Sequence, residues 1–575
     1  MNTLLNVLDV SFSRGSLLLF ENISFSINAG DRVGFVGHNG SGKSSLLSLI
    51  AGDEQPDDGE IRMPRGLRVA MVEQFVPSVL MPLTLIDAVL EIIPEEQRQE
   101  NRYRADELLA ELGFTAEQPA LPLHSLSGGQ QNLALLVRAI LLQPELMLMD
   151  EPGNHMDVLA LAHLQRFLLS DRSHSFLMIS HDRELLTTCC TRTLFLRDHT
   201  LYAFDLPFDS AAEALAEHDV QTTKARHAQE KEIKRLQTSA KRLALWGKTY
   251  DNEDLARKAK SMQKRVDRLK QEQTNVSRGS GLDLQLRTES LRAKSLATLE
   301  NLSVRTPDDK VMLLKIDFQH IRPGDRIALL GQNGVGKSST INRLVNSLGE
   351  IDDHVRFNPN VNLGYYDQEL QQFNSDRGRM DWLRDRSDKA DDQVKQVLLQ
   401  NGIAFPDFNR PVDRLSGGEC ARLMFMLFQL NKPNFLILDE PTNHIDVHGR
   451  EQLEQQLIES EATLLITSHD RRFIERVANR WWWVNDEKLI ELNELEEFYS
   501  VVTLGVEPEM NHKKTVESTR IEVAAHSMNS DEKLARIETL ETLLRDDKAR
   551  KAKFQKPDRQ RVWEKEIASL WGDLE

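Results

Sequence analysis

Two glycine-rich segments of the chain place a lysine and a serine at a spacing that can hold a polyphosphate. They are GHNGSGKS at residues 37–44 and GQNGVGKS at residues 331–338. Their glycines let successive backbone N–H groups point at one anion, and the start of the following helix adds partial positive charge. The lysine of each segment would reach the β- and γ-phosphates, and the next serine would offer its hydroxyl to Mg²⁺. Two copies at matching places make a chance glycine turn negligible.

The predicted phosphate-binding residues extend one position beyond each motif. They are Gly37, Asn39, Gly40, Ser41, Gly42, Lys43, Ser44 and Ser45 in the first segment, and Gly331, Asn333, Gly334, Val335, Gly336, Lys337, Ser338 and Ser339 in the second.

A second pair of segments carries adjacent carboxylates. LMLMDEPGNHMD (146–157) and FLILDEPTNHID (435–446) each run from an apolar stretch into Asp-Glu-Pro. The aspartates, Asp150 and Asp439, end predicted buried strands, where an open α/β sheet binds its ligand, so they could hold Mg²⁺. Side-chain alternation along the strand would turn the following glutamate away from the metal. Glu151 and Glu440 are therefore predicted to orient the water that attacks the γ-phosphate.

Further polar residues recur at matching places in the two halves. His181 and His469 follow apolar runs and precede an aspartate, where a histidine could contact the γ-phosphate and sense its loss. Gln74 and Gln368 are predicted to complete the shell of the metal and the water. Phosphoryl transfer depends mostly on positioning and charge stabilisation, which these residue types provide.

The constant order of these motifs indicates duplication of a whole domain. The two lysines are 294 positions apart, the two glutamates 289 and the two histidines 288. Short structural repeats would recur every ~20–50 residues instead. Each half alternates apolar, strand-like runs with helical runs, so we expect two α/β domains with parallel strands.

Composition narrows the class of protein. The chain has 575 residues, a net charge of −17 and three cysteines without metal spacing, which fits a reducing cytosol. No stretch approaches the ~18 consecutive apolar residues of a membrane span, and the start does not read as a signal peptide. We expect a cytoplasmic protein.

The segment between the halves has a different character. Residues 224–270 hold fifteen Lys and Arg against six Asp and Glu. Apolar residues at coiled-coil spacing predict two antiparallel helices, the first of ~30 residues and ~45 Å. These seam residues are Ile233, Leu236, Ala240 and Leu243, then Leu255, Ala259, Met262, Val266 and Leu269. A charged coiled coil is often a solvated spacer, but this basic rod in an acidic chain suits an RNA backbone.

The ordered set of P-loop, glutamine, LSGG, Asp-Glu and Ser-His-Asp resembles the nucleotide-binding domain of ABC ATPases. With EPTNHID and LSGGE, the chain resembles the ABC-F subfamily, twin-cassette proteins that act on ribosomes. The resemblance implies ATP and Mg²⁺ as ligands, and ATP hydrolysis by two cassettes facing head to tail within a monomeric chain. Each P-loop would share its ATP with the LSGG of the other cassette. Lys43 would thus meet Ser416, Gly417 and Gly418, and Lys337 would meet Ser127, Gly128 and Gly129.

The resemblance also implies an architecture and partners. We expect an α/β protein with two P-loop ABC nucleotide-binding domains at 1–212 and 281–506, an antiparallel coiled-coil linker at 213–280, and a polar segment with a small helical extension at 507–575. The linker would enter the tRNA exit region, and the protein would regulate translation or protect ribosomes, with rRNA and P-site tRNA as contacts and no transmembrane partner. Predicted RNA contacts are Trp246, Lys248, Tyr250, Lys258, Lys260, Lys264 and Arg265. Phe12 would stack on adenine, although a core role fits it almost as well.

Two other functions are alternatives to this one. An energy-coupling subunit of a membrane transporter would have no evident use for a basic coiled coil between fused cassettes. A DNA-repair cassette ATPase would carry cysteine-rich zinc insertions, which three scattered cysteines cannot build.

One difference between the copies predicts unequal sites. Gly153 stands where the second copy has Thr442, a β-branched residue that stiffens the backbone and can cap the next turn. The Lys43/Glu151 site would then hydrolyse ATP more slowly and the Lys337/Glu440 site would turn over. Neutral drift at a tolerant turn is the alternative.

Overall fold

The computed structural model describes residues 2–154, 156–170, 175–249, 253–271, 286, 288–306, 310–349, 352–368, 370–443 and 445–504. The chain up to Leu504 forms one compact unit. The extension predicted for residues 507–575 lies outside the described residues and stays a prediction.

The first repeat combines a six-stranded, mostly parallel sheet with a three-stranded antiparallel sheet. Their strand orders are β5-β6-β7-β3-β8-β9 and β2-β1-β4. The strands are β1 (Thr3–Arg14), β2 (Leu17–Asn28), β3 (Arg32–Gly37), β4 (Asp58–Arg62), β5 (Val69–Val72), β6 (Leu146–Asp150), β7 (Ser175–Ile179), β8 (Arg192–Arg197) and β9 (Thr200–Phe204). The helices are α1 (Lys43–Ala51), α2 (Leu85–Leu90), α3 (Glu95–Glu111), α4 (Gly128–Leu141), α5 (Val158–Leu169) and α6 (Arg183–Cys189).

The central strands of this sheet are buried on both faces. Every residue of β6 and β7 is buried. Met147 and Met149 belong to the core that contains α4, whereas Leu146 and Leu148 belong to the core shared with α1 and the antiparallel sheet. A parallel strand covered on both faces needs a continuous apolar run, which is what the sequence shows there.

The second repeat has the same topology. The order β14-β15-β16-β12-β17-β18 matches β5-β6-β7-β3-β8-β9, and its antiparallel strands join the sheet through one residue pair of β11 and β18. The strands are β10 (Ala297–Arg305), β11 (Met312–Ile321), β12 (Arg326–Leu330), β13 (Val355–Phe357), β14 (Leu363–Tyr366), β15 (Phe435–Asp439), β16 (Thr463–Thr467), β17 (Arg480–Asn485) and β18 (Lys488–Leu492). The helices are α9 (Lys337–Asn346), α10 (Arg379–Arg384), α11 (Asp391–Gln400), α12 (Gly417–Asn431), α13 (Val447–Glu459), α14 (Arg471–Val477) and α15 (Leu495–Leu504). Domain duplication is thereby confirmed.

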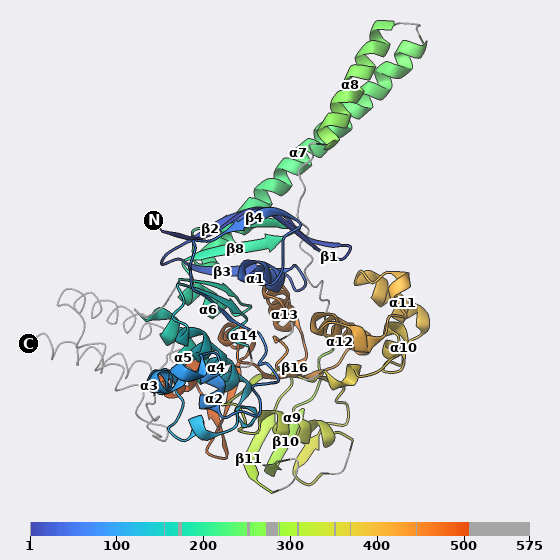
Figure 1. Ribbon diagram of the computed structural model, residues 1–575. Helices are drawn as coiled ribbons and strands as arrows, with labels where there is room; N and C mark the ends of the chain where they lie inside the picture. Colours follow the sequence, from blue (N-terminus) through green and yellow to red (C-terminus); the bar gives the residue numbers. More distant parts are fainter. Residues whose placement is uncertain are drawn as a thin grey trace, which may run out of the picture. The chain divides into compact units, whose positions relative to one another are not determined.

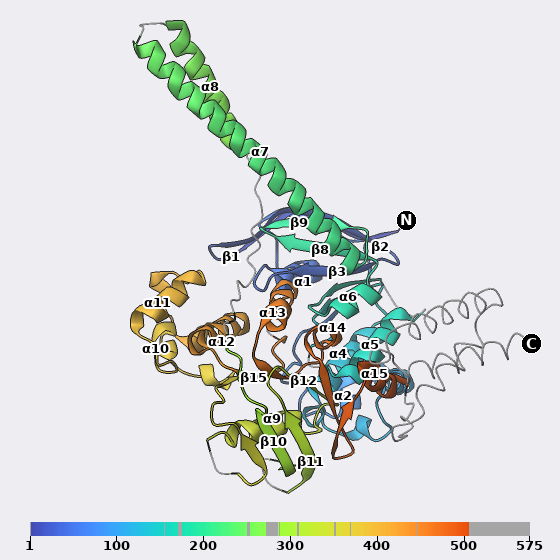
Figure 2. The ribbon, with the colours of Figure 1, turned by 180° about the vertical axis from the view of Figure 1, so that it is seen from behind.

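A helical hairpin connects the repeats, as predicted. Helices α7 (Phe208–Thr249) and α8 (Glu253–Gln271) lie side by side in Figure 1 and, seen from behind, in Figure 2. Ile233, Ala240 and Val266 of the predicted seam are buried. Helix α7 begins at Phe208, before the predicted linker boundary at 213, and Phe208 packs in the core of the first repeat.

The hairpin seam yields a stability prediction. Val266 is fully buried in α8, so Val266→Asp puts an unpaired carboxylate into the seam and should cost more than about 2 kcal/mol of local stability. We expect faster limited proteolysis within residues 208–271, with the melting of the cassettes unchanged. Lys264→Asp, at an exposed position of the same helix, is the control. If Val266→Asp and Lys264→Asp were both as resistant to protease as the unmodified protein, the seam would not be what holds the hairpin together.

Candidate functional site

Each P-loop connects a buried central strand to the helix that follows it. Lys43 donates from Nζ to the carbonyls of Gly37 (2.9 Å) and His38 (3.1 Å), both in its own loop. Lys337 does the same with the carbonyls of Gly331 (2.7 Å) and Gln332 (3.0 Å). Both ammonium groups therefore lie over the loop in which a phosphate would bind. Burial lowers the pKa of both lysines, and the nearby carboxylates oppose that shift.

The last glycine of each P-loop is required by its geometry. Gly42 has φ 96° and Gly336 has φ 100°, in the left-handed region. A Cβ at either position would stand 2.9 Å from the Cβ of Leu19 or Leu313. Only glycine combines this conformation with such a close approach, so the turn from the loop into the helix depends on it.

The aspartates predicted to hold the metal lie at the carboxyl ends of β6 and β15, beside the P-loop serines. Asp150 hydrogen-bonds the Ser44 side chain, and Asp439 hydrogen-bonds that of Ser338. Burial raises the pKa of both carboxyls, and these hydrogen bonds counteract the rise. A serine hydroxyl and a carboxylate are hard oxygen donors, so this set fits Mg²⁺.

The two predicted glutamines, Gln368 and Gln74, have different surroundings. Gln368 follows β14 and lines the same cavity as Lys337 and Asp439. Gln74 follows β5 and is half-buried. Its approach to Asp150 stays a prediction.

The adjacent glutamates adopt a conformation that strand alternation does not predict. Strands β6 and β15 end at the aspartates, and Glu151 (φ 51°) and Glu440 (φ 48°) are left-handed. Non-glycine residues in this region store strain and concentrate at functional sites. The turn is fixed by the backbone, because the Glu151 N–H donates to the Ile179 carbonyl (2.9 Å) and that of Glu440 to Thr467 (3.2 Å).

Both glutamate carboxylates are buried and poorly satisfied. Oε1 of each glutamate has no hydrogen-bond partner among the described residues, whereas the backbone N–H of His181 or His469 contacts the carboxylate of its own repeat. Burial raises the pKa of each glutamate to about 7, and the neighbouring lysine of its own P-loop opposes this. A carboxylate that titrates near neutral pH and keeps an open acceptor is suited to orient a water molecule and to take its proton.

The predicted histidines lie against these glutamates. His181 Nε2 is 3.4 Å from Oε1 of Glu151, and His469 Nε2 is 3.5 Å from Oε1 of Glu440. Each Nε2 also contacts the P-loop asparagine of its own repeat, Asn39 at 3.0 Å and Asn333 at 3.1 Å. Burial lowers the pKa of His181 well below its usual value and that of His469 to about 3. Both rings are therefore neutral at pH 7 and serve as hydrogen-bonding groups.

The two LSGG segments begin helices, as predicted. Ser127 caps α4 and Ser416 caps α12, each in a reciprocal capping box with the residue three positions on. Ser127 and Gly128 line a cavity of ≈ 440 Å³ whose other walls come from the second repeat. Those walls are Asn333, Gly334, Gly336, Lys337, Ser338, Ser339, Gln368, Asp439, Glu440, Asn443 and His469. The matching association of Ser416, Gly417 and Gly418 with Lys43 stays a prediction.

Reciprocal contacts join the closing aspartate of each repeat to the P-loop of the other. Asp157 Oδ2 accepts from the Asn333 N–H at 3.3 Å. In the opposite direction, Asp446 Oδ2 lies 3.0 Å from His38 Nδ1. His38 was not among the predicted site residues. A comparison of the two P-loops could have pointed to it, because His38 stands where the second repeat has Gln332.

The second repeat holds its acidic pair with hydroxyls that the first lacks. Thr467 donates from Oγ1 to Oδ1 of Asp439 (2.5 Å) and accepts from the Glu440 N–H (3.0 Å), whereas the first repeat has Ile179 there. The Thr442 hydroxyl bonds Ser468 Oγ at 3.2 Å. The expectation that it caps the next turn is therefore wrong: it ties that turn to the residue before His469.

Other predicted residues fall outside the site or outside the described chain. Phe12 is buried in β1 and stacks on Phe20 with ring centroids 6.0 Å apart, so its core role is the one seen here. Trp246 is 47% exposed on α7. The basic residues of α8 that were predicted to contact RNA are all exposed, namely Lys258, Lys260, Lys264 and Arg265. Lys248 falls within α7, its side chain is not described, and Tyr250 lies outside the described residues.

Among the described helices, none combines the length and apolar character that crossing a membrane requires. A model of the ABC transporter family matches residues 20–154 and 314–443. The probable ATP-binding protein YheS of Haemophilus influenzae is 30% identical over 85% of this chain and 81% of its own. The probable ATP-binding protein YbiT of Escherichia coli O157:H7 is 28% identical over 84% and 97%. The ribosome protection protein VmlR of Bacillus subtilis is 26% identical over 83% and 86%.

Solved structures extend the likeness to the fold of both repeats. The archaeal ribosome recycling factor aABCE1, solved with the stalk protein aP1, has a TM-score of 0.58 at 17% identity, over 90% of this chain and 98% of that one. The RNase-L inhibitor has a TM-score of 0.56 at 18% identity, over 86% and 93%. These structures support the twin-cassette fold. The sequence relatives, with the motifs placed above, show that the chain belongs to the ABC-F subfamily of ABC ATPases.

Proposed function

We propose that this ATPase binds the ribosome while both cassettes hold Mg-ATP, and that hydrolysis releases it. The observation that carries the proposal is the cavity shared by Lys337 of one repeat and Ser127 of the other. A nucleotide bound there would contact both repeats and favour their closed arrangement, and loss of the γ-phosphate would remove part of that contact.

We propose a role for each group that would surround the γ-phosphate. The lysine and the backbone N–H groups of the P-loop stabilise charge on the phosphate oxygens. Glu440 orients a water molecule for attack on phosphorus. The bond to the leaving ADP oxygen breaks, and the carboxylate takes the proton of the water, leaving ADP and inorganic phosphate. The neutral His469 ring donates a hydrogen bond from Nε2 to an oxygen of the γ-phosphate. Mg²⁺ held by Ser338 and Asp439 would neutralise charge on the phosphates.

The same roles apply at the first site, with Lys43, Glu151 and His181. There Ser416, Gly417 and Gly418 would close over the nucleotide. The reciprocal contacts of Asp157 and Asp446 with the opposite P-loops support two sites that each draw on both repeats.

Ribosome binding is supported by the linker and by a relative. The exposed basic side chains of α8 form a rod suited to RNA phosphates, within a chain of net charge −17. VmlR, a relative at 26% identity, is described as a ribosome protection protein. We propose that the hairpin enters the tRNA exit region, with rRNA and P-site tRNA as its contacts. The protein then acts in the cytoplasm, either regulating translation or protecting ribosomes.

Replacing both glutamates tests the proposal as a whole. Glu151→Gln with Glu440→Gln keeps the shape of the side chains but removes the proton acceptor, so hydrolysis should fall at least about a hundredfold while ATP binding persists. Closed protein should then accumulate on ribosomes, measured as ribosomal RNA recovered with the tagged protein. Glu145→Gln, at an exposed glutamate, is the control. No enrichment of ribosomal RNA over wild type would defeat the ribosome proposal.

Charge reversal on α8 tests the linker. Changing Lys258, Lys260, Lys264 and Arg265 to Glu should weaken ribosome binding and make the negative slope of log K against log salt shallower by up to about 3. ATP binding by the isolated protein should hardly change. A control with the same charge change alters exposed basic residues of the cassettes, Arg62, Arg65, Lys315 and Lys488. Unchanged ribosome affinity would make the hairpin a spacer.

Single-turnover hydrolysis tests the proposed inequality of the two sites. The hydroxyl of Thr467 fixes Asp439 and Glu440, whereas Ile179 offers no such bond, so the Lys337/Glu440 site should be the faster one. Glu440→Gln should therefore slow hydrolysis more than Glu151→Gln does. Thr467→Val removes only the hydroxyl, so it should reduce the difference in hydrolysis rate between the two sites. A larger loss in Glu151→Gln would reverse the assignment, and equal losses would show that these differences leave the sites equivalent.

A further inference from the structure

The base of helix α7 is attached to the second cassette by an ion pair with two parallel contacts. Arg472 of α14 reaches Asp209, the second residue of α7, with Nη1–Oδ1 2.6 Å and Nη2–Oδ2 2.7 Å. The same guanidinium contacts Thr187 Oγ1 of α6 at 3.3 Å. Two parallel bonds fix direction as well as distance. The hydrogen bond from Arg472 lowers the pKa of Asp209, so the carboxylate is ionised at neutral pH.

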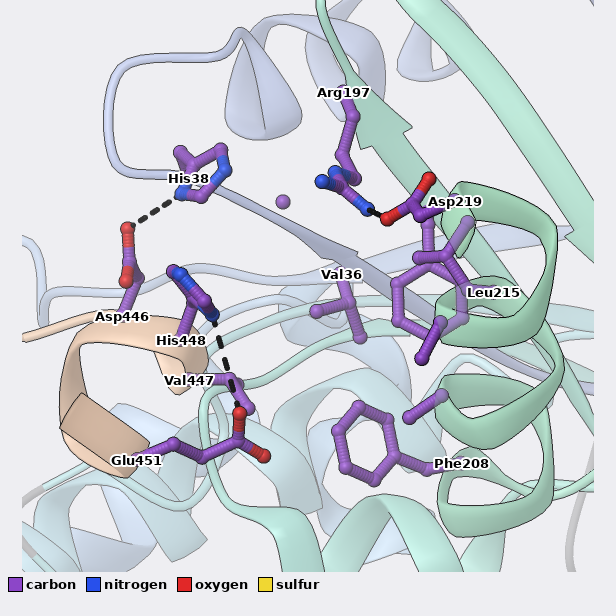
Figure 3. A pocket seen from close by; sticks show the side chains of 14 residues that line it. Val36, His38, Arg197, Phe208, Leu215, Asp219, Asp446, Val447, His448 and Glu451 are labelled. Carbon is purple, nitrogen blue, oxygen red and sulfur yellow. Dashed lines mark hydrogen bonds and ion pairs between the residues drawn. The ribbon is translucent and has the colours of Figure 1, made fainter. Parts of the chain in front are cut away.

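A second attachment lies at the start of α13. Val447, its first residue, packs in the apolar cluster that contains Phe208 and Leu215 of α7. The residue before it, Asp446, contacts His38 of the first P-loop. Figure 3 shows these groups around one pocket, with α13 approaching from one side and α7 from the other. One turn of the second cassette therefore touches both a nucleotide-binding loop and the base of the linker.

Between these attachments the joint is only partly packed. The pocket in Figure 3 is a cavity of ≈ 290 Å³ lined by α7, β8, the P-loop and α13. The ion pair of Arg197 with Asp219, 2.7 Å, closes its α7 side within the first cassette. A cavity of this size leaves the packing between α13 and α7 incomplete beyond Val447. The second cassette thus acts on α7 through few contacts, and the cavity leaves room for the base to shift.

The duplication repeats the apolar contact in the other cassette. Val158, which matches Val447, packs on the cluster formed by α15 and its neighbours in the second cassette. Helix α7, on which Val447 packs, has 42 residues. A helix of that length spans about 63 Å, so a rotation of about 5° at its base moves its far end by about 5 Å.

We propose that Asp209, Arg472 and Val447 are positioning residues that set the direction of the linker from the closed arrangement of the cassettes. The inference deepens the proposed function and rests on ATP closing the cassettes. Opening would pull Arg472 and Val447 away from α7, leaving the hairpin held only by the first cassette. A molecule that binds the hairpin would then meet a rod of fixed direction in the ATP-bound state. After hydrolysis and opening, the direction of the rod would vary.

The alternative is that Asp209 only stabilises the first turn of α7, where an acidic residue favours the helix dipole. The two roles differ in their dependence on Arg472. A local helix role is indifferent to Arg472→Gln, whereas the positioning role is lost equally with either partner. Arg471 provides the matched control, because it pairs with Glu475 of its own helix at 2.7 Å.

Pairwise distances between spin labels test the proposal in the full chain without ribosomes. Labels at Lys260→Cys on α8 and Asp392→Cys on the second cassette report linker direction, and labels at Tyr103→Cys and Asp392→Cys report closure. All three residues are exposed. The native cysteines are buried, and burial raises the pKa of the Cys189 thiol to about 12 and of the Cys420 thiol to about 11, so labelling favours the introduced sites. Glu151→Gln with Glu440→Gln serves as background to hold ATP.

In the background protein, ATP should shorten the closure distance and narrow the linker distribution. Asp209→Asn, Arg472→Gln and their combination should each close normally yet keep a broad linker distribution, with the double variant no broader than either single. Arg471→Gln should stay narrow. A narrow distribution in the Arg472→Gln protein would overturn the positioning role. Failure of ATP to close the background protein would instead count against the proposed function on which the inference rests.

Discussion

A buried ion pair between the repeats constrains most of what this molecule can do. Arg183 of the first cassette contacts Glu454 of the second, and their side chains are 4% and 1% exposed. Asp470 lies 3.7 Å from the same guanidinium, and Arg476 is 2.8 Å from Glu454. Desolvating such charges costs several kcal/mol per ion, and removing one partner typically costs about 3–5 kcal/mol. The repeats therefore cannot bury these groups separately. The network specifies how they face each other more than it adds net stability.

That register places one positive charge near both predicted catalytic glutamates. Arg450 of the second cassette donates to the His181 carbonyl of the first (3.0 Å) and lies 3.3 Å from Asp470. Its charge opposes the burial-driven rise in the pKa of Glu151 and of Glu440 alike. One guanidinium thus acts on both sites. The matching residue of the first repeat is Leu161, which offers no charge in return. A fold built by duplication is consequently asymmetric at its centre, where the pseudo-equivalent sites are closest.

How far the sequence predicted this arrangement depends on the range of the interaction. Motif order predicted the two cassettes and the P-loop residues, because spacing along one strand, turn and helix is a local property. The coiled-coil seam at Ile233, Ala240 and Val266 was predictable for the same reason. The left-handed glutamates were not, since alternation says nothing about where a strand ends. Contacts such as His38 with Asp446 join residues 408 positions apart, so single-sequence patterns cannot pair them. A residue-by-residue comparison of the repeats would at least have singled out His38, Ile179 and Leu161.

The same reasoning explains why the differences between the repeats cluster where they do. Residues that face a phosphate are nearly fixed by chemistry, so Lys43 and Lys337 keep equivalent contacts to their own loops. Residues that support them from behind can vary, because a hydroxyl, an aliphatic group or a guanidinium still fills the space while changing rigidity and charge. Thr467 and Ile179 occupy such supporting positions. So does Arg472, which matches Glu184 of the first repeat and is the residue that reaches the linker. Duplication preserved the residues that face the phosphate, and divergence in their support gave the second copy its contact with the linker.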